Sequence, residues 1–176
     1  MADDTKNDYC HICKDGDEVD IYICRDIGEP YRYVEAVQAL STHAKDRRIS
    51  VHINSNGGVA WAAIMIANAM RGRDKCQAIL EGDCCSAATF LALSASEIVV
   101  RPHSYMMFHD FYTASNYVKS HELEQRQCGE FAFLRKAMAE IYKGFLTAKE
   151  IKAMFDGRDY YLDEKEIVRR LKGWKR

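Results

Sequence analysis

The chain has 176 residues, 48% of them apolar and 29% charged, which is typical of one ordered globular domain. A formal net charge of −1 argues against a general binder of nucleic acids or membrane surfaces. No apolar run reaches the roughly 20 residues of a membrane helix. The polar first residues do not resemble a signal peptide. Seven cysteines without such a signal favour a reducing cytoplasm over a disulfide framework.

The first part of the chain alternates strand patterns with helix patterns. Strands are predicted where apolar runs end at polar or glycine-rich turns, over residues 19–24, 48–54, 76–81, 98–100 and 105–108. Helices are predicted between them, from Pro30 with an apolar face through residue 44, over residues 60–70 and over residues 86–95. This succession predicts an α/β fold with a mainly parallel sheet covered by helices.

The last third of the chain is predicted to be helical. One long amphipathic helix is expected over residues 120–142, with its apolar side formed by Phe131, Leu134, Met138 and Ile141. A second helix is expected to begin at Thr147, which forms a capping box with Glu150, and a third is expected between Asp163 and Gly173. We therefore expect one domain over residues 18–176, preceded by a polar and flexible segment over residues 1–17.

Reactive groups in an α/β sheet gather where strands end and helices begin. Ser86 is predicted to open a helix, beside backbone N–H groups that have no partner within the helix and can stabilise an oxyanion. The pair Gly57-Gly58 follows another strand and lets the backbone approach a substrate closely. Taken alone, Ser86 fits a helix N-cap equally well, and the glycine pair fits an ordinary turn.

The cysteines suggest two other sites, and neither is favoured. Cys10 and Cys13 have half of a zinc-site spacing, but no second Cys/His pair follows nearby, so no metal site is expected. Cys85 is a rival nucleophile to Ser86. Adjacent side chains point in different directions, however, so Cys85 is expected to be a small packing residue. No cofactor is expected.

Four segments, in chain order, resemble those of the proteolytic subunit of the Clp protease. Residues 53–58 are similar to Ile-Asn-Ser-Pro-Gly-Gly of that family, and residues 82–90 resemble its Gly-x-Ala-Ala-Ser nucleophile segment. Residues 101–109 match its stretch Pro-Asn-Ser-x-x-Met-x-His, and residues 157–166 resemble Glu-Arg-Asp-x-x-x-Ser-Ala-x-Glu-Ala. The resemblance covers about residues 19–173.

The resemblance implies a Clp protease/crotonase-like fold with a protruding helical handle, and a serine endopeptidase. Ser86 takes the place of the nucleophile, His109 that of the base and Asp159 that of the carboxylate that orients the base. The carboxylates of Asp110 and Asp156 are rivals to Asp159.

The substrate-binding residues are implied by the same resemblance. The backbone amides of Gly57 and Ala87 take the place of the oxyanion hole, and the segment around Gly57 and Gly58 is expected to bind substrate as an added strand.

The resemblance also implies assembly into homo-oligomers, with seven-membered rings stacked in pairs around a chamber that receives polypeptides. An ATP-driven AAA+ unfoldase is the partner expected from the family. Departures such as Asn56 in place of proline are similar to divergent bacteriophage members, some of which mature phage heads. The expected location is the cytoplasm, of the host if the chain is viral, with no nucleic acid or membrane as partner.

Two other functions stay open. One is a non-catalytic subunit or scaffold of the same fold, which would not need the three side chains. The other is a crotonase-like acyl-CoA enzyme, which holds a thioester oxyanion between backbone amides and would bind coenzyme A.

Overall fold

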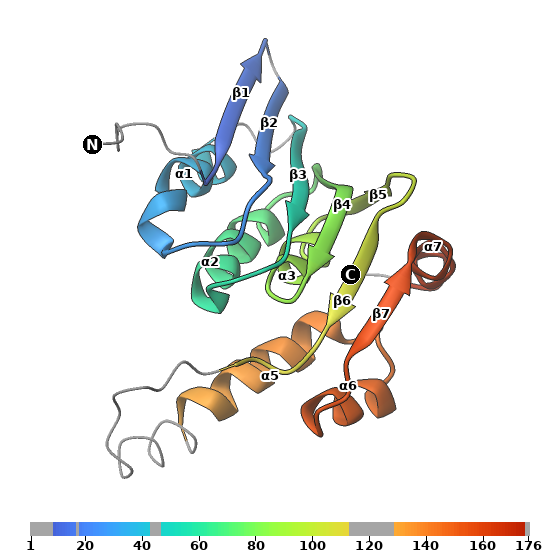
Figure 1. Cartoon of the computed structure of the whole chain (residues 1–176). Coiled ribbons are helices and arrows are strands. Elements are labelled where there is room, and N and C mark those ends of the chain that lie inside the picture. The colour runs from blue at the N-terminus through green and yellow to red at the C-terminus, as the bar shows by residue number, and fades with distance from the viewer. Residues whose placement is uncertain (1–8, 17, 43–46, 113–128, 175–176) are drawn as a thin grey trace, which may run out of the picture.

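The computed structural model of the chain describes residues 9–16, 18–42, 47–112 and 129–174. Within these ranges the strands form one seven-stranded, mostly parallel sheet in the order β1-β2-β3-β4-β6-β7, with β5 paired to β4 (Figure 1). The strands are β1 (His11–Asp15), β2 (Glu18–Ile23), β3 (Ile49–Ser55), β4 (Cys76–Cys85), β5 (Glu97–Val100), β6 (Tyr105–Phe108) and β7 (Tyr160–Asp163). The predicted α/β class is confirmed.

Helices pack against one face of this sheet and continue beyond the ends of β6 and β7 (Figure 1). The described helices are η1 (Pro30–Tyr33), α1 (Val34–Thr42), α2 (Ala60–Arg71), α3 (Ala88–Ala92), α5 (Glu130–Tyr142), α6 (Ala148–Phe155) and α7 (Glu164–Leu171). None of these described helices combines the length and the apolarity that a membrane span requires.

The core lies between the parallel strands and the helices. Every second residue of β2, of β3 and of β4 as far as Leu80 is buried; Ile21, Val51 and Ala78 belong to this set and are aligned across the sheet. The alternate residues point to the other face. There His52 Nδ1 lies 2.7 Å from Glu81 Oε1, and the His52 ring stacks on Tyr22. Strand alternation therefore separates an apolar face from a polar one.

The two halves of strand β4 pair with two different strands, β5 and β6. Its residues Gln77–Leu80 pair in parallel with β5, and its residues Asp83–Cys85 pair in parallel with β6. β6 then pairs antiparallel with β7, with Phe108 opposite Tyr160. The second half of β4 thus carries a small extension of the sheet that ends beside Ser86.

The prediction that β4 ends near Glu81 is wrong. The strand continues through Gly82 to Cys85, and Asn54 of β3 occupies the space that a side chain at Gly82 would take. Asn54 Oδ1 accepts a hydrogen bond from the Asp83 amide at 3.0 Å, which replaces a regular strand contact at this point. A glycine in a strand here marks a close approach and not an end.

The helix boundaries differ from the prediction at two places. Helix α3 covers only Ala88–Ala92, whereas a helix over residues 86–95 was expected. The long helix expected over residues 120–142 is described as α5 from Glu130 onward, and residues 113–128 lie outside the described residues. Residue 44, expected on the first helix, is also outside them.

Two strands were not predicted. β1 occupies residues 11–15 of the segment that was expected to be flexible, although its side chains are mostly exposed and give no apolar alternation. β7 has only four residues and exists through its pairing with β6. Cys10, the first residue of the half zinc motif, is buried in the core, and burial raises the pKa of its thiol to about 12.

The predicted helix caps are confirmed. Thr147 and Glu150 form a complete capping box at α6, with the Glu150 amide donating to Thr147 Oγ1 at 3.2 Å. Asp163 accepts a hydrogen bond from the Glu166 amide at 2.8 Å and begins α7. These caps begin the two helices that flank residues 156–162, the segment that contains Asp159.

Candidate active site

Ser86 lies in a sharp turn between β4 and α3. Its φ angle of 54° places it in the left-handed region, which costs a residue with a side chain roughly 1–2 kcal/mol. Helix α3 begins after Ala87 and has no side-chain cap, so Ser86 is not a helix N-cap. A strained serine between a strand and a helix is a feature that proteins retain at functional sites.

Gly57 packs directly against this turn. A Cβ atom at Gly57 would lie 2.7 Å from Ser86 Cβ and 2.9 Å from the Ala87 nitrogen. The φ angles of Gly57 and Gly58 are 98° and 137°, conformations that other residues rarely adopt. Glycine is therefore favoured at both positions by the backbone conformation, and at Gly57 also by the contact with the serine.

The amides of the two glycines have different environments. The Gly57 N–H donates to Ser55 Oγ at 3.1 Å, and the Gly57 carbonyl accepts from the Ile27 amide at 2.6 Å. Because a trans peptide directs its N–H opposite to its carbonyl, the Gly58 N–H points away from Ile27. Among the described residues neither the Gly58 N–H nor the Ala87 N–H has an acceptor. Two unused donors thus lie next to Ser86.

His109 immediately follows β6. Its ring is 8% exposed and packs at 4.9 Å from the ring of Tyr112. Its buried Nδ1 has no hydrogen-bond partner within the described part of the chain. A buried imidazole nitrogen without a partner costs about 1–3 kcal/mol, so the arrangement calls for an acceptor at this atom.

Asp159 is the residue just before β7. The pairing of β6 with β7 advances from Tyr105 opposite Asp163 to Phe108 opposite Tyr160. One further step of this register places His109 opposite Asp159, and directly opposed residues project to the same side of a sheet. The Asp159 side chain is exposed and forms no hydrogen bond with any described residue.

The two rival carboxylates have partners elsewhere. Asp110 pairs with Arg135 of α5, and Asp156 pairs with Lys152 at 2.7 Å on the surface of α6. Of the three candidate carboxylates, Asp159 is the one that forms no ion pair with any described residue. The structure thus brings Ser86 and His109 to one pocket, whereas Asp159 is not among the residues that line it.

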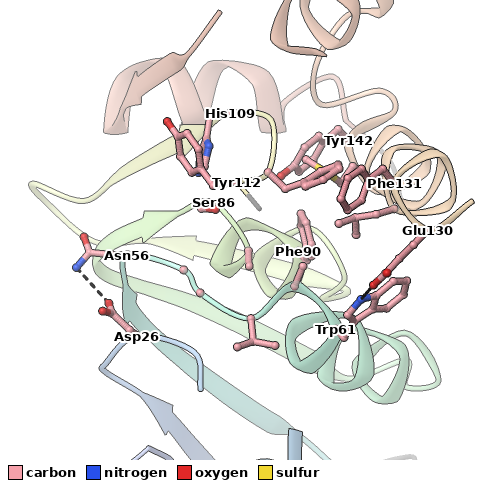
Figure 2. Close-up of a pocket in the computed structure, with 18 residues that line it drawn as sticks. Asp26, Asn56, Trp61, Ser86, Phe90, His109, Tyr112, Glu130, Phe131 and Tyr142 are labelled. Carbon is pink, nitrogen blue, oxygen red and sulfur yellow. Dashed lines mark hydrogen bonds between the residues drawn. The ribbon is translucent and has the colours of Figure 1, made fainter. Parts of the chain in front are cut away.

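A pocket of about 570 Å³ contains both Ser86 and His109. Figure 2 shows these two residues at one end of the pocket and Trp61 and Glu130 at the other. The large apolar side chains that also line the pocket include Phe90, Phe111, Phe131, Leu134, Met138 and Tyr142. A pocket of this size accepts a large apolar side chain and leaves room for the chain that carries it.

The described residues that line the pocket include two acidic side chains. Asp26 lies at one edge, where Asn56 donates to it at 3.4 Å, and Glu130 lies at the other edge, where Trp61 Nε1 donates to it at 3.1 Å (Figure 2). No lysine or arginine is among the described residues that line the pocket. The pocket therefore combines an apolar centre with negatively charged edges.

Neither of the two cysteines before the serine lines the pocket. Cys84 and Cys85 are both buried, and burial raises the pKa of each thiol. A buried thiol of this kind is a poor nucleophile because the thiolate is the reactive form. Ser86 is thus the residue of this segment that reaches the pocket. Among the described residues no three His, Cys, Asp or Glu side chains are grouped so that they could hold a metal ion.

Comparison with known proteins identifies the family. The family model described as Clp protease matches residues 16–170, which is most of the chain. The chain belongs to the Clp protease family. A search of curated proteins finds no match. Members of the Clp protease family are typically serine peptidases, and membership implies oligomeric assembly in general.

Two residues near Ser86 were missed by the sequence analysis. Thr89 of α3 and Tyr142 of α5 are completely buried, and their hydroxyl oxygens lie 2.9 Å apart. They are separated by 53 positions in the chain. Nothing in the local pattern of either segment indicates the contact, and the family segments that point to Ser86 do not include Tyr142.

Proposed function

We propose that this member of the Clp protease family is a serine endopeptidase that cleaves polypeptides with Ser86 as nucleophile, His109 as general base and Asp159 as the orienting carboxylate. The observation that carries the proposal is the strained turn that presents Ser86, next to two unused backbone donors, in the pocket that also contains His109. Neither a scaffold nor a packing role requires this combination.

The chemistry follows from the residue types. The Ser86 hydroxyl oxygen attacks the carbonyl carbon of the scissile peptide, and its proton passes to His109. The peptide C–N bond then breaks, and the leaving amine takes that proton from His109, which leaves an acyl group on Ser86. Water, deprotonated by the same imidazole, releases the acyl group and restores the serine.

The amides of Gly58 and Ala87 are the proposed donors to the oxyanion. Both are unused in the described structure, whereas the Gly57 amide is engaged by Ser55 Oγ. This assignment keeps the two glycines at the substrate-binding position and differs from the family-based expectation in the amide that donates. Such a donor contributes about 100-fold or more to turnover.

Asp159 is the proposed acceptor for His109 Nδ1–H. Its support is the β6–β7 register, which ends with Phe108 opposite Tyr160 and would bring the next two residues opposite each other if it continued, together with the unpartnered and buried Nδ1. The pair is open in the isolated chain. We propose that it closes when the chain assembles, since α5, α6 and β7 belong to the region that extends beyond the main sheet (Figure 1).

The finer expectations on assembly and partners are also part of the proposal. Stacked rings of seven subunits that enclose a chamber, an AAA+ unfoldase partner, and a role in phage head maturation come from the family resemblance. Oligomeric assembly in general follows from family membership. The pocket itself favours substrates with a large apolar side chain next to the cleaved bond.

The test is covalent labelling of the purified protein with a fluorophosphonate, read as intact mass. We expect one adduct on the wild type, none on Ser86→Ala, and a strongly reduced rate on His109→Gln. Cys85→Ala is the matched control, because it changes the neighbouring residue without removing the proposed nucleophile, and it should label like the wild type.

Other outcomes would redirect the proposal. Absence of labelling on a folded and assembled wild type, together with binding of coenzyme A, would support the crotonase-like alternative. Absence of both would support a non-catalytic subunit. An adduct that persists on Ser86→Ala would place the reactive residue elsewhere.

A further inference from the structure

A buried chain of hydroxyl groups connects α5 to the main chain of Ser86. Thr89 Oγ1 donates to the Ser86 carbonyl oxygen at 2.6 Å, and it lies 2.9 Å from Tyr142 Oη. A carbonyl can only accept, so the single hydroxyl proton of Thr89 is committed to Ser86. Tyr142 must therefore donate to Thr89, and the direction of the chain is fixed from Tyr142 to Thr89 to Ser86.

The main chain of Ser86 is held on both sides. Its N–H donates to the Met107 carbonyl of β6 at 2.8 Å, and its carbonyl also accepts from the Thr89 amide at 3.0 Å. The carbonyl that receives two donors belongs to the residue whose φ angle of 54° is unfavourable. Such a conformation persists only when the surrounding contacts stabilise it by more than its conformational cost.

Tyr142 also touches the segment that supplies the base. Its ring meets the ring of Phe108 edge-on at 5.1 Å, and Phe108 is the residue immediately before His109. It packs at 5.7 Å from the ring of Phe90 in α3 as well. Burial raises the pKa of Tyr142, so its hydroxyl keeps the proton that it donates.

We propose that Thr89 and Tyr142 are positioning residues that hold Ser86 in its reactive conformation and set it relative to His109. The inference rests on the proposed function of Ser86 as nucleophile. Neither residue is assigned a chemical step. A buried Thr–Tyr pair with a purely structural role would stabilise the fold equally but would leave the reactivity of Ser86 unchanged.

The experiment separates the two roles by the kinetics of fluorophosphonate inactivation. In Thr89→Val, which keeps the shape and loses the hydroxyl, we expect the maximal inactivation rate to fall roughly 10- to 100-fold with little change in the half-saturating probe concentration. Tyr142→Phe should show a smaller fall of about 3- to 10-fold. Thr89→Ser, which keeps the hydroxyl, should restore most of the rate.

Ser104→Ala is the matched control for the loss of a buried hydroxyl. Ser104 is 2% exposed, donates to the Arg101 carbonyl at 2.7 Å and does not line the pocket. This variant should lose stability without a change in the inactivation rate. Each variant is compared at equal oligomeric mass, measured by light scattering.

The outcomes distinguish the inference from the proposed function. If the wild type labels at Ser86 and Thr89→Val labels at the same maximal rate, the positioning role is overturned while the proposed function stands. If Thr89→Ser is as slow as Thr89→Val, the hydroxyl is not the cause and the inference also fails. A wild type that does not label at all overturns both.

Discussion

Ser86, Gly57 and Gly58 all have positive φ angles, of 54°, 98° and 137°. Two of these positions are compatible with glycine alone, because a Cβ atom at Gly57 would meet Ser86 and one at Gly58 would lie 2.2 Å from the Ile27 carbonyl oxygen. The site is therefore shaped by backbone conformation as well as by side chains. Substitution of either glycine would displace the backbone that carries the proposed N–H donors.

Gly58→Ala tests the role of this backbone. The added Cβ forces the segment away from Ile27 and turns the Gly58 amide, so we expect peptidase activity to fall about 100-fold or more. Gly16→Ala is the control, since Gly16 also has a positive φ of 55° but has no atom within 4 Å of the added methyl group. If both Gly16→Ala and Gly58→Ala were as active as the wild type, the Gly58 amide would be excluded as an oxyanion donor.

Asp159→Asn tests the orienting carboxylate. An amide in place of the carboxylate no longer fixes the imidazole in the productive tautomer, and the turnover number should fall by about 10⁴-fold with little change in KM. Asp156→Asn is the matched control three positions earlier, where the carboxylate pairs only with Lys152 on the surface. If the two variants lost activity to the same small extent, another acceptor would have to serve His109.

At the scale of elements, His109 directly follows β6 and Asp159 directly precedes β7. Helices α6 and α7 precede and follow β7 in the chain. The connection between α6 and α7 is an ion pair in which Arg170 Nη2 contacts Glu150 Oε1 at 2.7 Å. Glu150 also completes the capping box at Thr147. Hydrogen bonds from Arg170 are the main cause of the low pKa of Glu150, about 2 instead of 4.5.

Acid should weaken this connection. Because the pKa of Glu150 is lower in the folded chain, its contribution to stability is complete above about pH 4.5 and is lost as the pH falls toward 2. We expect the urea midpoint of the wild type to fall more steeply between pH 5 and about pH 3 than that of Glu150→Gln. The same pH dependence in both proteins would show that Glu150 does not contribute. Lys152→Gln, which removes an exposed pair, should follow the wild type.

The elements differ in how well the sequence predicted them. Strong local patterns predicted the strands of the parallel core and the caps at Thr147 and Asp163, because alternation and cap chemistry act over a few residues. β1 and β7 lack such patterns and depend on pairing with distant strands. The end of β4 was misplaced because a glycine signals a turn locally, whereas here Asn54 fills the space beside it.

The candidate site was predictable to a similar extent. Ser86 and His109 were found through their resemblance to family segments, and the structure brings them to one pocket. The direction of the Gly58 amide was not predictable, since it follows from the hydrogen bonds of Ile27. The contact between Thr89 and Tyr142 joins residues 53 positions apart and has no local signal.

At the scale of the whole molecule, the parallel sheet has helices on one face and an open polar face on the other. Parallel sheets are ordinarily covered on both faces. Several large apolar side chains are also exposed in the described chain, among them Tyr31, Tyr112, Phe133 and Tyr161, each more than 60% exposed. These surfaces are consistent with the oligomeric assembly that family membership implies.

The assembly is testable by light scattering over a dilution series. We expect a folded species with a mass several times the 20.2 kDa of the chain. Phe133→Glu, on the exposed side of α5, should shift that species toward smaller masses, and Lys136→Glu on the same helix is the control for a change of charge. A folded wild type that stays at the mass of one chain at all concentrations would exclude the oligomer.

Strand β4 is shared between β5 and β6, and this division has a consequence for amide hydrogen exchange. The residues Gln77–Leu80 lie within the main sheet between β3 and β5, whereas Asp83–Cys85 pair with the short strand β6 and meet β3 only at Asn54 and Ser55. Modification of Ser86 should therefore slow deuterium uptake in the second segment and in β6, and leave the first segment unchanged. One strand would then report separately on the stability of the fold and on the state of its pocket.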